Sequence, residues 1–292
     1  MDREYKLLKV GSDAEFFVLQ NAVPTPICGR IGGTKAEPRP VLSGNGFAVQ
    51  EDNVALEFNI PPASSAREFA DSIVTMLAYL KGELAKQDLV AEYRSEENFL
   101  QADLKKHLEA YHFGCEPDYC VWTRTVNPTP TYDPYMVVNP LSKEKETVES
   151  RNAGFHIHVS YLVNGESSSL EDKEWFVKAQ DLFLGVPLTS LEVRHHNKNI
   201  LHRRRYYGCA GAFRPKEYGH EYRVLGSSAL TPNLELNEWI FQQNQVAIAF
   251  LNNKTNVEEI FRDHHEYIVT AINRYSSDHI QHLMHHFGIR LP

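Results

Sequence analysis

The chain has 292 residues, of which 42% are hydrophobic and 23% charged, and its formal net charge is −8. This composition is typical of a folded soluble protein, and the acidic balance disfavours a general nucleic-acid binder, which is usually basic. No apolar run approaches the roughly 18 residues that a membrane-spanning helix needs. The 4 cysteines form no CxxC pair and are expected to be reduced thiols. We therefore expect a cytoplasmic protein that binds neither nucleic acid nor a membrane.

The first 60 residues predict β-structure, interrupted by a glycine-rich loop over residues 23–46. Ser65 and Glu68 then form a capping-box pattern, and apolar residues at helical spacing predict a helix to about residue 87. Residues 110–150 contain five prolines and predict irregular structure. A second helix is expected after Ser169, and Gly185-Val186-Pro187 is expected to end it.

Residues 233–292 predict a helical C-terminal portion packed on the rest of one catalytic domain that spans residues 1–292. Its helices are expected from Asn233 to about Asn252, from Val257 to Tyr275 and from Ser277 to Phe287. Strands and helices do not alternate regularly along the chain, which argues against βαβ units. The pattern favours an α+β fold whose largely antiparallel sheet has one face on helices and one polar face.

Four separated segments combine polar functional residues with apolar residues in alternation, as strands with two different faces do. They are Gly11-Ser12-Asp13-Ala14-Glu15, Gln50-Glu51-Asp52-Asn53-Val54-Ala55-Leu56-Glu57, Gly154-Phe155-His156-Ile157-His158 and Glu221-Tyr222-Arg223. Period-two alternation places Asp13 with Glu15, Glu51 with Glu57, His156 with His158, and Glu221 with Arg223. If the strands join one sheet, its polar face carries a dense group of carboxylates. Oxygen ligands at this density suit a hard divalent cation such as Mg²⁺ or Mn²⁺.

His156-Ile157-His158 leaves three interpretations open. An HxH pair on a strand occurs in zinc hydrolases, although zinc sites usually add further histidine, cysteine or aspartate ligands. One imidazole could instead bind a magnesium or manganese ion while the other faces a nucleotide or substrate. Both could also be half-buried structural residues. The histidine-rich C-terminal residues are interpreted as surface or packing residues on helices.

The basic residues Arg203-Arg204-Arg205, Arg214 and Lys216 precede the Glu221-Tyr222-Arg223 segment. In an acidic protein this placement indicates fixed positive charge for a phosphoryl group, since the arginine fork matches phosphate oxygens. The chain has no GxxxxGK[ST] loop and no GxGxxG motif. Recognition of a nucleotide would therefore depend on metal ions and arginines.

The ordered motifs resemble the phage-associated carboxylate–amine ligases (type 2 amidoligases) of the glutamine synthetase and glutamate–cysteine ligase superfamily. The likeness runs from about residue 8 to 230 and includes Gly33-Thr34-Lys35, Glu116-Pro117-Asp118 and Gly208 to Lys216 besides the four segments above. The resemblance implies a curved sheet that binds ATP and two or three Mg²⁺. It implies metal ligands at Asp13, Glu15, Glu51, Glu57, His156 and Glu221. It also implies nucleotide contacts by Lys35, His158, Lys216 and Arg223.

The function expected on these grounds is ATP-dependent ligation of an amine to a carboxylate through an acyl phosphate. Arg204, Arg214 and Arg223 would neutralise the transferring phosphoryl group, and Asp118 is a candidate base. The substrates would be small-molecule or peptide carboxylates and amines, in the host cytoplasm if a phage encodes the chain, and an oligomer is compatible with the family. Two rivals remain: a metal-dependent hydrolase that uses the histidine pair, and a non-catalytic phage protein on a ligase scaffold.

Overall fold

The computed structural model describes residues 3–111, 118–127, 134–138, 142–195, 200–253 and 255–292. Its main feature is a twelve-stranded sheet in the order β3-β4-β5-β1-β12-β15-β14-β8-β9, to which β2, β6 and β13 add at the sides. The strands are β1 Tyr5–Gln20, β2 Val23–Thr25, β3 Arg39–Pro40, β4 Ala48–Asp52, β5 Ala55–Ala63, β6 Leu89–Glu92, β8 Tyr119–Cys120, β9 Thr125–Val126, β12 Phe155–Val163, β13 Glu166–Ser167, β14 Ala212–Lys216 and β15 Gly219–Tyr222.

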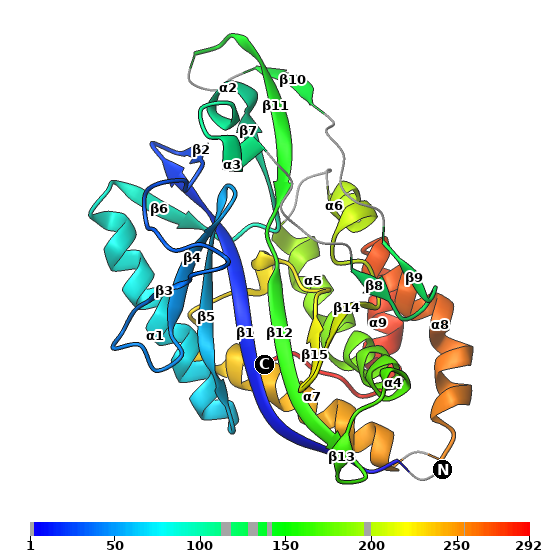
Figure 1. Ribbon diagram of the computed structural model, residues 1–292. Coiled ribbons are helices and arrows are strands. Elements are labelled where there is room, and N and C mark those ends of the chain that lie inside the picture. Colours follow the sequence, from blue (N-terminus) through cyan, green and yellow to red (C-terminus); the bar gives the residue numbers. More distant parts are fainter. Residues whose placement is uncertain (1–2, 112–117, 128–133, 139–141, 196–199, 254) are drawn as a thin grey trace.

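Every strand pair described in this sheet is antiparallel. The longest strand, β1, lies between β5 and β12 and runs beside β12 through the middle of the molecule (Figure 1). The helices are α1 Ala66–Ala85, α2 Gln101–Leu104, α3 Leu108–Tyr111, α4 Leu170–Gln180, α5 Val186–His195, α6 Ile200–Tyr206, α7 Leu234–Asn253, α8 Val257–Asn273 and α9 Ser277–His286. The expected α+β class with a large antiparallel sheet is therefore confirmed.

One face of the sheet packs on helices and forms the main core. Leu56 and Phe58 of β5 and Ile157 of β12 are fully buried in the same apolar cluster as Phe69 of α1 and Phe241 of α7. The rings of Phe69 and Phe241 lie 6.2 Å apart, which joins the two helices beneath the strands. Because alternate strand residues point away from this core, the polar residues of β1, β5, β12 and β15 must lie on the opposite face.

The helix that starts after Ser169 does not end at Gly185, contrary to the sequence-based prediction. It passes through a π-helical turn, Asp181–Gly185, and continues as α5 from Val186. Pro187 is tolerated because it falls in the first turn of the new α-helical segment, where its missing N–H is not needed. Gly185 permits close packing, since an added Cβ would lie 2.3 Å from the hydroxyl of Tyr222.

A second sheet in the order β10-β11-β7 corrects the prediction of irregular structure up to residue 150. Its strands are β7 Glu96–Leu100, β10 Tyr135–Val138 and β11 Lys145–Asn152, and it lies at one end of the molecule in Figure 1. β11 pairs with both neighbours and leads into β12 after only two residues. Pairing with the distant β7 supplies ladder hydrogen bonds that local sequence does not reveal.

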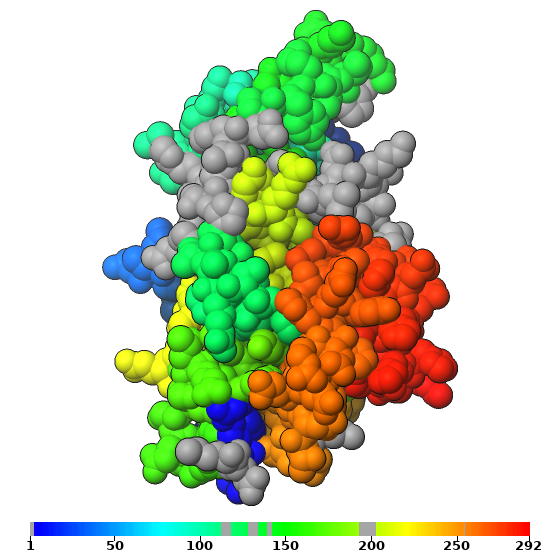
Figure 2. All heavy atoms as spheres, turned by 90° about the vertical axis from the view of Figure 1, so that its right-hand side faces the viewer, coloured from blue at the N-terminus to red at the C-terminus, as the bar shows by residue number. Residues whose placement is uncertain are grey.

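Helices α8 and α9 cover another side of the molecule, in orange and red beside the green segment of residues 118–127 in Figure 2. The ring of Trp122 stacks on His265 of α8 at 4.8 Å and meets Phe261 at 6.0 Å. The predicted C-terminal helices are thus present within two residues of their expected ends. None of the helices in the described part of the chain is long and apolar enough to cross a bilayer.

Candidate functional site

The register of the central strands brings the four polar segments together on one face. Asp13 of β1 lies opposite His156 of β12, and Glu15 of β1 lies opposite Glu57 of β5. On the next pair of strands, His158 lies opposite Glu221. The segments therefore form neighbouring strands in the order β5-β1-β12-β15. A pocket of about 330 Å³ is lined by Asp13, Glu15, Asp52, Glu57, His156 and Glu221, while His158 lines another pocket. The prediction that these segments join one sheet is confirmed.

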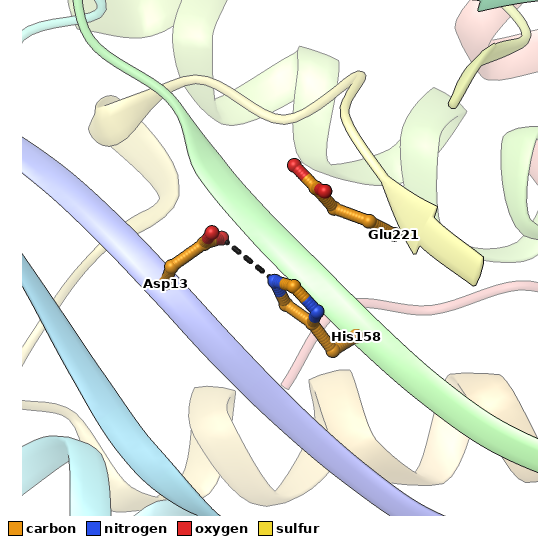
Figure 3. Close-up of side chains that lie close together, drawn as sticks. All are labelled: Asp13, His158 and Glu221. Carbon is orange, nitrogen blue, oxygen red and sulfur yellow. Dashed lines mark ion pairs between the residues drawn. The ribbon is translucent and has the colours of Figure 1, made fainter. Parts of the chain in front are cut away.

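Asp13, His158 and Glu221 form the first of two groups, among the residues that the structure describes, that could hold a cation (Figure 3). They come from three adjacent strands, and each offers one ligand atom within 4.8 Å of the others. Nε2 of His158 lies 3.0 Å from Oδ1 of Asp13, and Nδ1 of His158 lies 2.5 Å from the Tyr218 hydroxyl. His156, which the sequence favoured as a ligand, lies beside this group with Nδ1 3.2 Å from the same Asp13 oxygen.

Glu15, Asp52 and Glu57 form the second group, and all of its ligand atoms are carboxylate oxygens. Gly154 fixes Glu15, because its N–H donates to Oε2 of Glu15 at 2.8 Å. A side chain at position 154 would collide with the site, since an added Cβ would lie 2.3 Å from Nε2 of His156. Glycine is therefore needed at this position to let β1 and β12 bring the acid and the imidazole together.

Glu51 does not share the face of Glu57, and the prediction that it does is wrong. Residues 53 and 54 form a turn, with Asn53 at a φ of 56°, so the alternation restarts between β4 and β5. Gln50 therefore lies opposite Glu57, and Glu51 lies opposite Leu56. A turn residue with positive φ is a common role of asparagine.

The carboxylate of Glu51 instead organises the glycine-rich loop. Its Oε1 accepts from the N–H groups of Arg30, Ile31 and Gly32 at 2.6–2.9 Å, and its Oε2 accepts from that of Gly29 at 2.6 Å. Asp52 takes the place in the acid cluster that the sequence assigned to Glu51. The Asp52-Asn53 turn signal in the sequence could have shown this shift.

Positive side chains border both acid groups. Lys216 Nζ lies 3.1 Å and Arg214 Nη1 3.5 Å from Oε2 of Glu221. On the other side of the pocket, Lys35 Nζ lies 2.8 Å from Oδ2 of Asp52. These three residues line the pocket and are partly exposed, so they can reach a ligand placed over the carboxylates.

Arg223 lies between the acid groups and a deeper part of the site. Its Nη1 contacts Oε1 of Glu221 and lies 3.3 Å from Nδ1 of His156. Its Nε lies 2.5 Å from Oδ1 of Asp118. As expected, Tyr222 points to the opposite, buried face, where its hydroxyl donates to Asp181.

Arg204 does not reach the pocket, which corrects its predicted role. Its Nη2 lies 2.7 Å from Glu192, its Nε donates to the Tyr275 hydroxyl at 2.9 Å, and Nη1 donates to the Gly208 and Val224 carbonyls. These contacts join α6 to α5, to the turn between α8 and α9, and to the chain after β15. Its neighbour Arg203, by contrast, lines a cavity beside the acid groups.

Burial and mutual charge shift the titration of the clustered acids. Burial raises the pKa of Glu57 well above its usual range, and the charges of Asp13 and Glu15 act in the same direction. Burial also raises the pKa of Glu15, although His156 opposes it. For Asp13 burial acts upward too, but the imidazoles of His158 and His156 hold its pKa well below the usual range.

His158 shows the reciprocal effect. Burial acts to lower its pKa, but Asp13 raises it, so the imidazole and the carboxylate stabilise each other's charge. Without a cation, burial and like charge favour the protonated carboxyls of Glu15 and Glu57. A divalent ion would displace those protons and remove the repulsion.

A family model described as phage phiEco32-like COOH.NH2 ligase-type 2 matches residues 145–285. The matched segment contains His156, His158, Glu221 and Arg223, whereas the acids of β1, β4 and β5 precede it on adjacent strands of the sheet. No curated protein matches the chain. The match confirms the resemblance seen in the motifs. The description of that family supports an enzyme and, in general, a carboxylate–amine ligase.

Proposed function

We propose that the protein is an ATP- and Mg²⁺-dependent carboxylate–amine ligase. The observation that carries this proposal is the pair of acid groups on one sheet face, bordered by Lys35 on one side and by Arg214 and Lys216 on the other. Carboxylates next to positively charged side chains are suited to bind a nucleoside triphosphate together with its metal ions. The phosphate oxygens require positive charge, and the ions require oxygen ligands.

The donor atoms fit hard divalent ions. Glu15, Asp52 and Glu57 offer only carboxylate oxygens, and Asp13 and Glu221 add two more around a single imidazole, that of His158. Oxygen-rich sets of this kind suit Mg²⁺ or Mn²⁺ better than zinc, which favours nitrogen and sulfur. The crowded carboxyls also explain why a cation is needed, since burial and like charge raise the pKa of Glu57.

The bound nucleotide would supply the γ-phosphoryl group that turns a carboxylate, a poor electrophile, into an acyl phosphate. Arg214 and Lys216 of β14, and Arg223 directly after β15, line the pocket and would neutralise the phosphoryl oxygens as negative charge shifts. His158 would act at the cation, where the sequence analysis expected His156, and His156 would help to orient Arg223. Under the same proposal the sheet has a glutamine synthetase-like fold whose polar face binds the metal ions.

Asp118 is proposed to position Arg223 rather than to act first as a base. Its carboxylate is buried and lies against Nε of Arg223, so this contact orients the remaining N–H groups of the guanidinium. An aspartate that orients a buried arginine contributes to catalysis through geometry. The amine is then expected to approach from the pocket side, where the acids are accessible.

Thermal unfolding with defined ligands tests the proposal. Mg²⁺ with ATP should raise the melting temperature more than the sum of the shifts with either alone, because they bind the folded state together. Release of ADP or phosphate on addition of carboxylates and amines would establish turnover. Stabilisation by zinc alone, with hydrolysis that needs no nucleotide, would favour the hydrolase. No shift with Mg·ATP would favour a non-catalytic protein.

A further inference from the structure

Tyr218 lies in a tight turn that holds its side chain beside the ring of His158. It is the second residue of the two-residue turn between β14 and β15, where Lys216 pairs with Gly219. The Tyr218 carbonyl accepts from the N–H of Tyr161 in β12 at 3.3 Å. An added Cβ at Gly219 would collide with a backbone oxygen of β12, so glycine is needed for the turn to lie this close to the strand. The backbone therefore fixes where the phenol ring of Tyr218 begins.

The hydroxyl of Tyr218 makes a short hydrogen bond with His158. It lies 2.5 Å from Nδ1, whereas the other ring nitrogen, Nε2, lies 3.0 Å from Oδ1 of Asp13. Figure 3 shows this second nitrogen directed at Asp13. The imidazole is thus held between the phenol on one side and the first acid group on the other. A hydroxyl can donate or accept, so the hydrogen bond alone allows either nitrogen of His158 to carry the proton.

Two atoms of the first acid group are buried without a hydrogen bond to any described residue. They are Nε2 of His158 and Oδ1 of Asp13. Buried polar atoms without partners are costly, so both atoms fit a site that is completed by a ligand. A cation bound by Asp13, His158 and Glu221 would use them both. For this, Nε2 must present its lone pair, and the proton of the neutral imidazole must then be on Nδ1.

We propose that Tyr218 is a positioning residue that selects this form of His158 for the cation. Its hydroxyl oxygen accepts a hydrogen bond from Nδ1–H, which leaves the lone pair of Nε2 directed at the first acid group. A histidine that binds a metal ion usually donates from its other ring nitrogen, and the acceptor fixes the ring orientation and makes the ligand more basic. The inference deepens the proposed function and rests on it for the identity of the ion, Mg²⁺ or Mn²⁺.

The opposite arrangement would make His158 a purely structural residue. If the Tyr218 hydroxyl donated to Nδ1, the proton of the neutral ring would be on Nε2 and would have to be donated to Asp13. Nε2 and Oδ1 of Asp13 lie 3.0 Å apart but do not form a hydrogen bond. This geometry disfavours the opposite arrangement and leaves Nε2 available as a ligand atom.

Tyr218→Phe removes only the hydroxyl and keeps the ring. The residue is 44% exposed, so the variant should fold normally. Tyr267→Phe is the matched control, because Tyr267 of α8 is 42% exposed and its ring also contacts histidines, His279 and His282. His158→Gln removes the ligand nitrogen. Combining it with Tyr218→Phe separates an effect that passes through His158 from a direct one.

The test is calorimetric titration of the full chain with Mn²⁺ in the absence of nucleotide, at the site that His158→Gln weakens. Tyr218→Phe should weaken binding there by about tenfold or more, as expected when a ligating histidine loses its outer partner. Tyr267→Phe should bind like the unchanged protein, and Tyr218→Phe should cause no further loss in the His158→Gln background. NMR of Mg²⁺-saturated protein with ¹⁵N-labelled histidine gives a second measurement. The proton of His158 should be on Nδ1, and Tyr218→Phe should remove this preference.

An unchanged Mn²⁺ affinity in Tyr218→Phe would overturn the inference. An equal loss in the His158→Gln background would do the same, as would a proton on Nε2 in the Mg²⁺-saturated protein. The affinity for Mg·ATP is measured separately on the unchanged protein. If Mg·ATP binds and Tyr218→Phe leaves the Mn²⁺ affinity unchanged, only the positioning role fails. If neither Mg·ATP nor Mn²⁺ binds the unchanged protein, the proposed function fails and the positioning role fails with it.

Discussion

Nε of Arg223 lies 2.5 Å from Oδ1 of Asp118, and both residues are at least nine-tenths buried. The cation expected to stabilise the phosphoryl group and the acid considered as a base therefore form one ion pair. Nη1 of the same guanidinium contacts Glu221 in the first acid group. The position of this arginine is thus fixed from two sides, as a preorganised electrostatic group requires.

Arg223→Lys should lower kcat by roughly 10²-fold or more, on the order of 3 kcal/mol, with much less change in ATP affinity. Lysine keeps the charge but cannot contact Asp118 and Glu221 at the same time. Steady-state kinetics measure the effect. Near-normal turnover would remove Arg223 from the mechanism.

Arg204→Lys is the matched variant, and it should lower the stability of the protein rather than kcat. Arg204 contacts Glu192, Tyr275 and two backbone carbonyls in the interior, so its loss should reduce the free energy of unfolding by about 3 kcal/mol. Denaturant unfolding measures this loss, and kcat of the folded fraction should stay near that of the unchanged protein. A stable variant with severely reduced kcat would restore Arg204 to the phosphoryl site.

Glu57→Gln should stabilise the metal-free protein and abolish the extra stabilisation by Mg·ATP. The carboxyl of Glu57 is buried beside Asp13 and Glu15, and burial and these charges raise its pKa well above the usual range. Removing the charge therefore removes repulsion as well as a ligand. Melting temperatures with and without Mg·ATP measure both effects. Loss of stability in the metal-free variant would show that Glu57 has a structural partner.

Glu51→Gln should instead destabilise the protein by about 2 kcal/mol, because a charged acceptor of several loop N–H groups is replaced by a neutral amide. Urea denaturation measures the change. Glu57→Gln, which makes the same chemical substitution at the other acid, is the comparison. If both variants shifted stability in the same direction, the different positions assigned to these two acids would be contradicted.

Asp181→Asn should remove a component of the pH dependence of stability. Burial raises the pKa of Asp181 to about 7, against the hydrogen bonds from Trp122 and Tyr222. Because the folded-state pKa is raised, the contribution of Asp181 to the free energy of unfolding is fully present below the unfolded-state pKa, near 4. This contribution is lost as the pH rises to about 7. The free energy of unfolding of the unchanged protein, relative to the variant, should therefore fall between pH 4 and 7 and level off above it. Asp263→Asn, on the exposed surface of α8, should leave the profile unchanged.

Alternation within single strands was enough to predict much of the site. Asp13 and Glu15 lie within β1, His156 and His158 lie within β12, and Arg223 directly follows the end of β15, so period two placed these pairs correctly. The prediction for Glu51 failed because a turn at Asn53 interrupts the period. The face of a side chain is thus predictable within a strand but not across a turn whose length is unknown.

Contacts between distant segments determine two features that the sequence did not predict, the position of Arg204 and the continuation of the helix through Gly185. Arg203 and Arg204 are adjacent and identical, yet Glu192 and Tyr275 hold one of them away from the site. The helix likewise continues through Gly185, where the glycine lets Tyr222 of a distant segment approach closely. In both cases tertiary packing outweighs the local signal.

Anomalous diffraction from crystals soaked with Mn²⁺ and a non-hydrolysable ATP analogue tests the central claim most directly. We predict manganese peaks within coordination distance of Asp13, His158 and Glu221 and of Glu15, Asp52 and Glu57, with the γ-phosphate between them and Arg223. Manganese confined to other places, such as the histidines of α9, with no nucleotide over the sheet, would contradict the assignment of this face as the ligase site.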